Sequence, residues 1–201
     1  MSQLSDLDQE IRVCQRCILA KSRTNAVPGE GPEDAAILFI GEGPGFHEDR
    51  LGRPFVGAAG QYLEELLGRI GLMRSGVYIA NVIKCRPPAN RDPEPVEIEA
   101  CRPYLDRQIE LIRPRLVVTL GRFSMARYFP GATISRIHGQ PKRIGSVIYY
   151  PMFHPAAALH QPTLRPTVDE DFCRIPELLT RLGDVREEKP EPPQAEQLSL
   201  F

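Results

Sequence analysis

Short runs of consecutive apolar residues alternate along the chain with segments in which apolar residues recur every three or four positions. The apolar runs predict four buried strands at residues 36–41, 76–83, 115–121 and 146–152. The amphipathic segments predict helices at residues 60–72, 94–114, 122–129 and 168–183. Strands that alternate with helices are typical of an α/β fold. We therefore predict an α/β/α three-layer fold with a mainly parallel, four-stranded sheet.

Polar residues stand where three of these strands end. Glu42 follows the first strand, Asn81 lies near the end of the second, and His154 follows the fourth. In open parallel sheets, ligands bind outside the carboxyl ends of the strands. We therefore expect these side chains to share one site.

Length and composition indicate one ordinary globular domain. The chain has 201 residues, of which 42% are hydrophobic and 25% charged, and its net charge of −1 gives no bulk positive field for nucleic acid. Residues 1–183 are predicted to form the domain, and the Pro- and Glu-rich residues 184–201 a disordered tail. The first residues lack a signal-peptide core and no apolar run could span a membrane, so we expect a cytoplasmic protein without membrane contact.

Four cysteines form a pattern typical of a metal site. Cys14 and Cys17 make a C-x2-C pair, and Cys85 and Cys101 follow far downstream. In a cytosolic chain, clustered cysteines more often bind metal than form disulfides. The spacing fits a four-thiolate site for zinc or an iron–sulfur cluster, and equally fits unrelated buried thiols. Cys173 falls within the last predicted helix and is expected in the core.

Four further motifs resemble one enzyme family. They are "GEGPGFHED" at 41–49, "GRPFVG" at 52–57, "YIANVIKCRPP" at 78–88 and "PMFHPAAAL" at 151–159. With the four cysteines, in this order and spacing, they look like the family 4 uracil-DNA glycosylases. The resemblance implies a uracil-DNA glycosylase-like fold, excision of uracil from DNA as the first step of base excision repair, and a [4Fe–4S] cluster on Cys14, Cys17, Cys85 and Cys101. We expect that cluster to be structural, because hydrolysis transfers no electrons.

The resemblance also implies roles for the residues that bind the base. Uracil must leave the base stack to be cut from its sugar, so the enzyme needs a closely fitting base pocket. Phe55 is similar to the family's stacking aromatic, and Asn81 to the residue that reads the base edge. One amide can donate to uracil O4 and accept from N3–H, whereas cytosine presents the opposite pattern.

The remaining assignments concern the chemical step. His154 matches the histidine that stabilises the departing uracil anion, and its imidazole can act either neutral or protonated. Glu42 and Glu48 are the expected carboxylates for orienting water and favouring a cationic sugar. Gly43 stands in the substrate-binding turn where other glycosylase families carry an aspartate.

Arg136 and His138 resemble the end of an arginine-rich loop in a related sub-class that cross-links to uracil DNA. This chain lacks the basic run before that loop, with Ile134 and Ser135 in its place. We therefore expect Arg136 and His138 to contact DNA phosphate. Cross-linking through His138, or a non-catalytic iron–sulfur module that binds DNA, are the alternative functions.

The last five residues, "QLSLF", resemble the short motif by which bacterial repair proteins bind the DNA polymerase sliding clamp. Gln197, Leu198, Leu200 and Phe201 would insert into an apolar pocket, and the preceding tail would act as a tether. The alternative is that this end packs on its own domain or on another copy. We otherwise expect a monomer with uracil-containing DNA as its partner.

Overall fold

A computed structural model describes residues 2–183 and shows a single five-stranded sheet. The strands are β1 (Ile37–Gly41), β2 (Tyr78–Asn81), β3 (Leu116–Leu120), β4 (Lys142–Ile144) and β5 (Val147–Met152), in the order β2-β1-β3-β5-β4. All neighbouring strands are parallel except β4 and β5. The α/β fold is confirmed, but the expected count of four strands is wrong. β4 leaves no apolar pattern in the sequence, because its three residues are exposed and two of them are basic.

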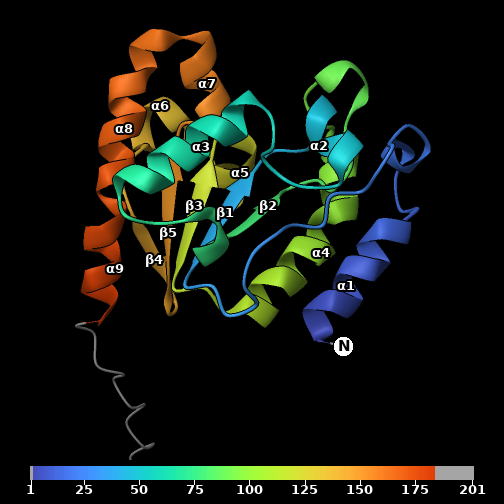
Figure 1. Cartoon of the computed structure of the whole chain (residues 1–201), viewed down its shortest axis with the longest axis horizontal. Coiled ribbons are helices and arrows are strands. Elements are labelled where there is room, and N and C mark those ends of the chain that lie inside the picture. Colours follow the sequence, from blue (N-terminus) through green and yellow to red (C-terminus); the bar gives the residue numbers. More distant parts are fainter. Residues whose placement is uncertain (1, 184–201) are drawn as a thin grey trace, which may run out of the picture.

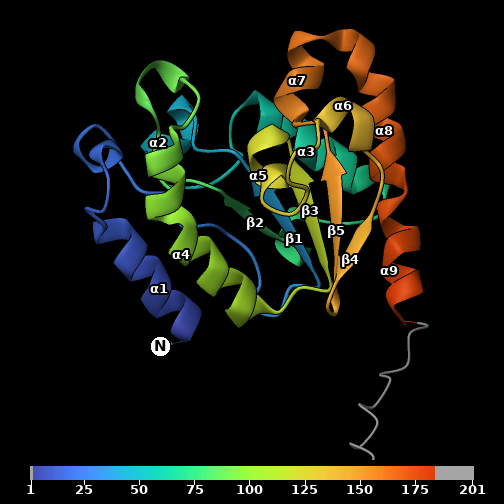
Figure 2. The ribbon, with the colours of Figure 1, turned by 180° about the vertical axis from the view of Figure 1, so that it is seen from behind.

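Helices cover both faces of the sheet (Figures 1 and 2). Leu38 and Ile40 of β1 pack with α1 (Gln3–Val13) and α4 (Pro95–Ile112), while Phe39 points to the other face, toward α3 (Ala58–Arg69) and α8 (Arg165–Cys173). This alternation follows from the two-residue period of a strand. Because both faces are buried, every residue of β1 is apolar or glycine.

The predicted helix at residues 168–183 is two helices. α8 ends at Cys173, and α9 (Ile175–Gly183) begins two residues later. Pro176 in the first turn of α9 has no N–H to donate, which ends the hydrogen-bond ladder of α8 at this point. The expectation that Cys173 lies in the core is wrong, because it is exposed at the end of α8.

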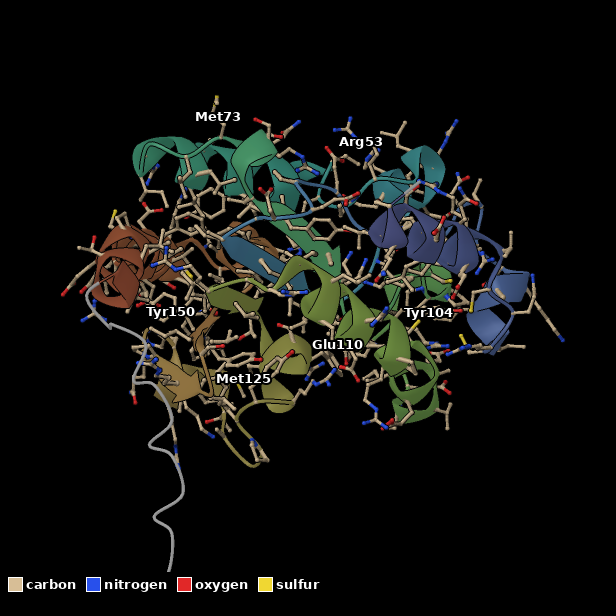
Figure 3. All side chains as sticks on the ribbon, turned by 90° about the horizontal axis from the view of Figure 1, so that it is seen from below. Arg53, Met73, Tyr104, Glu110, Met125 and Tyr150 are labelled. Carbon is tan, nitrogen blue, oxygen red and sulfur yellow. The ribbon has the colours of Figure 1, made fainter. Side chains whose placement is uncertain are left out.

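Four short helices lie at the carboxyl end of the strands (Figures 1 and 2). They are α2 (Phe46–Leu51), α5 (Arg122–Ala126), α6 (Ile134–Ile137) and α7 (Pro155–His160). Of these four, α2 and α7 contribute residues that line the site described below. In Figure 3, Met73 points outward at the edge of the molecule and is 73% exposed. Tyr150, labelled in the same view, is buried.

The two edges of the sheet differ, because one is covered by another segment of the chain and the other is a short exposed strand. The outer side of β2 is covered by the segment before β1, where Glu30 pairs with Ile79 and the Val27 N–H donates to the Lys84 carbonyl at 2.7 Å. The opposite edge is the short, exposed β4. Within residues 2–183, no helix is long and apolar enough to cross a membrane.

Candidate functional site

A pocket of about 480 Å³ opens at the carboxyl end of the strands, as the strand-end residues predicted. Its wall is built from the segments that follow β1, β2 and β5, together with the turn before α3. The lining residues include Glu42, Gly43, Pro44, Gly45, Glu48, Phe55, Asn81, Ile83, Asn90, Arg91, Asp92, His154 and His160. All six residues expected to serve base binding or the chemical step therefore line one cavity.

Phe55 is held in an unusual backbone conformation at the pocket wall. Its φ of +50° is rare for a bulky residue. Arg74 donates to the Phe55 carbonyl at 2.9 Å and to the Pro54 carbonyl. Glu48 Oε1 accepts from the N–H groups of Val56 and Gly57, at 2.9 and 2.8 Å. These bonds fix the turn, so the ring stacks on His154 with its centroid 5.5 Å away.

Two glycines make room for Phe55, one beside its ring and one beside its backbone. A Cβ built on Gly41 would stand 2.4 Å from Asn81 Oδ1 and 2.6 Å from Phe55 Cε2. A Cβ on Gly60, in α3, would stand 1.9 Å from the Phe55 carbonyl oxygen. All three distances are far shorter than real contacts, so neither position accepts a side chain without movement of the pocket wall.

Asn81 is 2% exposed at the end of β2, in register with Gly41 of β1. Its backbone is anchored from below, because the buried Lys84 Nζ donates to the Asn81 carbonyl at 2.9 Å and to Gln108 Oε1 at 2.6 Å. Burial lowers the pKa of Lys84 to about 8, and the nearby Cys101 and Asp8 oppose the decrease. The residue that faces the pocket is thus fixed by a cation three positions along the chain.

His154 is presented as a neutral hydrogen-bond donor. It caps α7, where its Nδ1 accepts from the Ala156 N–H at 3.1 Å. Burial lowers the pKa of His154 to about 4, and the charge of Glu48 opposes this. A neutral ring that accepts at Nδ1 carries its proton on Nε2. Of the two protonation states left open by the sequence, the structure favours the neutral one.

Glu42 and Glu48 are used differently. Glu48 Oε1 is occupied by the turn that holds Phe55. Glu42 directly follows β1 and is half-buried, and its pKa is raised by burial and by Asp92, with Arg122 opposing. A carboxylate with a raised pKa is a better general base near neutral pH. Of the two acids expected to serve the chemical step, Glu48 therefore supports the turn, and Glu42 is the one suited to accept a proton from water.

The four cysteines of the predicted metal site come together from three parts of the chain. Cys85 and Cys101 are buried, and Cys14 and Cys17 pack against the same core. Burial raises the pKa of Cys85, and the neighbouring thiols Cys17 and Cys14 add to the increase. The hydroxyl of Tyr104, a residue of α4 labelled in Figure 3, donates a hydrogen bond to the Cys14 sulfur.

Hydrogen-bond donors surround these sulfurs. Arg23 Nη1 lies 3.1 Å from Cys85 Sγ, the Lys84 N–H lies 3.4 Å from Cys101 Sγ, and the Arg16 N–H lies 3.4 Å from Cys14 Sγ. Donors and cations stabilise thiolates, which are the form that binds iron. Within residues 2–183, no three His, Cys, Asp or Glu side chains are arranged for a metal ion. Four cysteine thiolates are the usual ligands of a [4Fe–4S] cluster, and the four cysteines with their hydrogen-bond donors fit such a group.

Arg136 and His138 are not among the residues that line the pocket. His138 Nδ1 lies 2.7 Å from Asp171 Oδ2, and its ring packs against Phe153, which follows β5. Burial raises the pKa of Asp171, and His138 opposes the increase. His138 is thus held by a buried acid beside the strand that carries His154. Gln197 to Phe201 lie outside the described residues.

Sequence reasoning missed the residues that support the site from behind. Arg74 and Lys84 hold the backbones of Phe55 and Asn81, and Gly41 and Gly60 leave space for the ring. Lys84 did carry a signal, because a lysine inside the apolar run "YIANVIKC" needs a buried partner. Arg74 carried none, since its partners are two carbonyls and two carboxylates, of Glu30 and Glu64, that only folding brings near.

Comparison with known proteins agrees with the motifs. A family model described as the uracil DNA glycosylase superfamily matches residues 28–175. The chain is 48% identical to the type-4 uracil-DNA glycosylase of Sulfurisphaera tokodaii, over 89% of this chain and 86% of the relative. It is 49% identical to that of Archaeoglobus fulgidus, over 89% of this chain and 94% of the relative. The corresponding protein of Thermotoga maritima is 42% identical, over 88% and 95%.

The resemblance seen in the four motifs is therefore confirmed over nearly the whole domain. The fold, with its mostly parallel sheet and helices on both faces, agrees with it. This chain belongs to the uracil-DNA glycosylase superfamily and, within it, to the type-4 uracil-DNA glycosylases.

Proposed function

We propose that this protein hydrolyses the N-glycosidic bond of deoxyuridine in DNA, releasing uracil and leaving an abasic site. The observation that carries the proposal is the convergence of Phe55, Asn81 and His154 on one cavity at the end of the sheet. Membership of the type-4 family supports the reaction, since the relatives are named as uracil-DNA glycosylases.

The base is read by an aromatic ring and a fixed amide. Uracil rotated out of the duplex stacks on Phe55, and its O4 and N3–H pair with the Asn81 side chain. Cytosine would leave both groups mismatched in a buried position, at a cost of roughly 1–3 kcal/mol for each. Because Lys84 anchors the Asn81 backbone, the side chain extends toward the base from a fixed main-chain position.

The chemical step uses charge stabilisation at both ends of the breaking bond. The His154 Nε2–H donates to uracil O2 and stabilises the negative charge that develops on the base. Glu42 orients water toward the sugar carbon and accepts its proton. Glu48 positions Phe55 through the turn and adds negative charge near the cationic sugar.

The four cysteines hold a [4Fe–4S] cluster. Cys14, Cys17, Cys85 and Cys101 are the ligands, and Arg23 with the neighbouring N–H groups stabilises their sulfurs. The cluster would join the segment after α1, the end of β2 and the first half of α4. Since hydrolysis moves no electrons, its contribution is structural.

The alternatives are less well supported. Cross-linking through His138 is not favoured by the type-4 relatives, and Arg136 and His138 remain residues expected to contact DNA near the product. A non-catalytic DNA-binding module would not need a donor and an acid facing one pocket. Binding of the sliding clamp through residues 197–201 rests on the sequence motif alone and is tested by deleting those residues.

The deciding experiment uses labelled oligonucleotides with a single uracil or a single cytosine. The protein should release uracil only, so that alkali breaks the uracil strand at one position on a denaturing gel. Asn81→Asp should slow uracil excision at least about tenfold, the cost of one misdirected buried hydrogen bond. An intact strand after alkali would refute the function. A protein–DNA band that survives denaturation and disappears in His138→Ala would establish cross-linking instead.

A further inference from the structure

An exposed phenylalanine with two arginines against it lies at the rim of the pocket. Phe46, the first residue of α2, is 46% exposed. The guanidinium carbon of Arg86 lies 5.1 Å from the centre of its ring, and that of Arg50 lies 5.7 Å away. We refer to Arg50 and Arg86 as the arginine pair.

The arginine pair lies next to two segments that line the pocket, namely α2 with the turn before it and the segment after β2. Phe46 follows Gly45 and comes two residues before Glu48, both of which line the cavity. Arg86 Nε donates to Asn90 Oδ1 at 2.6 Å, and Asn90 is another lining residue. Both guanidinium groups therefore lie beside segments that line the pocket.

The charges of this pair are not neutralised by acids. Near the same rim, Arg91 pairs with Glu97 at 2.6 Å, and Arg122 pairs with Asp92. Among residues 2–183, neither Arg50 nor Arg86 forms such an ion pair. Stacking on an aromatic face holds a guanidinium in place and leaves its N–H edge available to an anion. The ring thus orders two arginines without cancelling their charge.

We propose that Arg50 and Arg86, ordered on Phe46, bind backbone phosphates of the DNA strand beside the extruded uridine. Guanidinium groups are well suited to phosphate oxygens, and contacts of this kind position DNA without reading its sequence. This would explain how a protein with a net charge of −1 holds DNA at its pocket. The proposal rests on the function proposed above and names part of its DNA-binding surface.

The test is the salt dependence of binding to an oligonucleotide that carries a stable abasic analogue. Each phosphate contact contributes about 0.7–0.9 to the slope of log affinity against log salt concentration. Arg50→Gln and Arg86→Gln should each reduce the slope of the full-length protein by about that amount, and the double variant by about twice as much. Arg107→Gln is the matched control, because Arg107 is exposed, pairs with Glu110, and lies in the second half of α4.

The possible outcomes separate this proposal from the function itself. If the wild type binds DNA and both variants keep its slope, the arginine pair does not contact phosphate. If Arg107→Gln lowers the slope as much as the other two, the effect is one of general charge and the proposal fails as well. A wild type that neither excises uracil nor binds the oligonucleotide would instead refute the proposed function.

Discussion

Phe55 illustrates how single residues are set in place before any substrate arrives. A bulky residue at φ +50° costs roughly 1–3 kcal/mol, so the conformation persists only because other bonds impose it. Arg74 supplies two of these bonds and Glu48 two more. His154 is fixed in the same way, by a backbone N–H at Nδ1. The pocket is therefore preorganised by bonds to the main chain.

The division of work between the two acids can be separated by kinetics. Glu42→Gln should lower kcat about 10²-fold or more with little change in KM, because a general base is lost while the pocket is kept. Glu48→Ala should lower the thermal midpoint and raise KM, because two half-buried N–H groups lose their acceptor.

Glu48→Gln is the control for this pair, since its carbonyl oxygen can still accept from the turn. We expect it to restore the midpoint and KM. If it instead lowers kcat as strongly as Glu42→Gln at unchanged stability, the charge of Glu48 acts directly in the chemical step.

The neutral state of His154 predicts a pH dependence of stability. The unfolded chain takes up this proton near pH 6.5 and the folded chain only near pH 4, so the unfolded state binds more protons between these values. This residue therefore destabilises the fold as the pH falls from 6.5 to about 4. Urea unfolding of His154→Gln should show a smaller loss of stability across that range than the wild type.

His160→Gln serves as the comparison, because it removes an imidazole from the exposed end of the same helix. If His160→Gln and His154→Gln change the pH dependence of stability equally, the assignment of a neutral His154 is wrong. The same neutrality implies that titration of His154 should not alter the excision rate between pH 6 and 8.

At the scale of elements, the site depends on how closely α3 approaches the turn before it. Gly60 lies in the first turn of α3, against the Phe55 carbonyl. Gly57 is the N-cap residue of the same helix, and its N–H donates to Glu48. A shift of α3 would therefore also shift the Phe55 ring.

Two glycines of α3 give a matched test of this contact. Gly60→Ala should destabilise the protein by about 1–3 kcal/mol and slow uracil excision, because its Cβ would overlap the Phe55 carbonyl. Gly68→Ala has nothing within 4 Å of its Cβ and should stabilise the helix by about 0.5–1 kcal/mol. Thermal unfolding and single-turnover excision measure both. Equal effects of the two variants would refute the contact.

The pattern of apolar residues predicted the α/β class, the four long strands and the edge of the sheet where the pocket lies. Those strands are long and buried, so their signal is local. β4 and α2 are too short and polar to leave a pattern, and α7 has only six residues. Arg74 and Gly60 matter only through partners brought near by folding, which periodicity cannot reveal. The split between Glu42 and Glu48 likewise required the turn geometry.

At the scale of the whole molecule, the four thiols connect parts of the chain that the sheet alone does not join. Cys14 and Cys17 follow α1, Cys85 follows β2, and Cys101 lies in α4. Cys85 is also four residues from Asn81. A cluster here would couple the N-terminal segment to the strand that reads the base.

Cys85→Ala tests this coupling. The native protein should be brown and contain about four irons per chain, as a four-iron cluster requires. The variant should lose colour and iron, unfold at a lower temperature, and be cut by protease near residues 14–22. Cys173→Ala is the control, because this exposed cysteine lies outside the set. A colourless native protein that contains zinc and is fully active would refute the cluster.

The covered edge of β2 also matters when molecules meet. An open strand edge is a template on which a second chain can add a strand and start aggregation. Here the segment from Val27 to Glu30 takes the outer bonds of β2, and the opposite edge is a three-residue strand with Lys142 and Arg143 exposed. To extend the sheet, another copy would have to displace the Val27–Glu30 segment from β2 or bury the charges of Lys142 and Arg143 at β4. The protein should therefore resist association through its sheet even at high concentration.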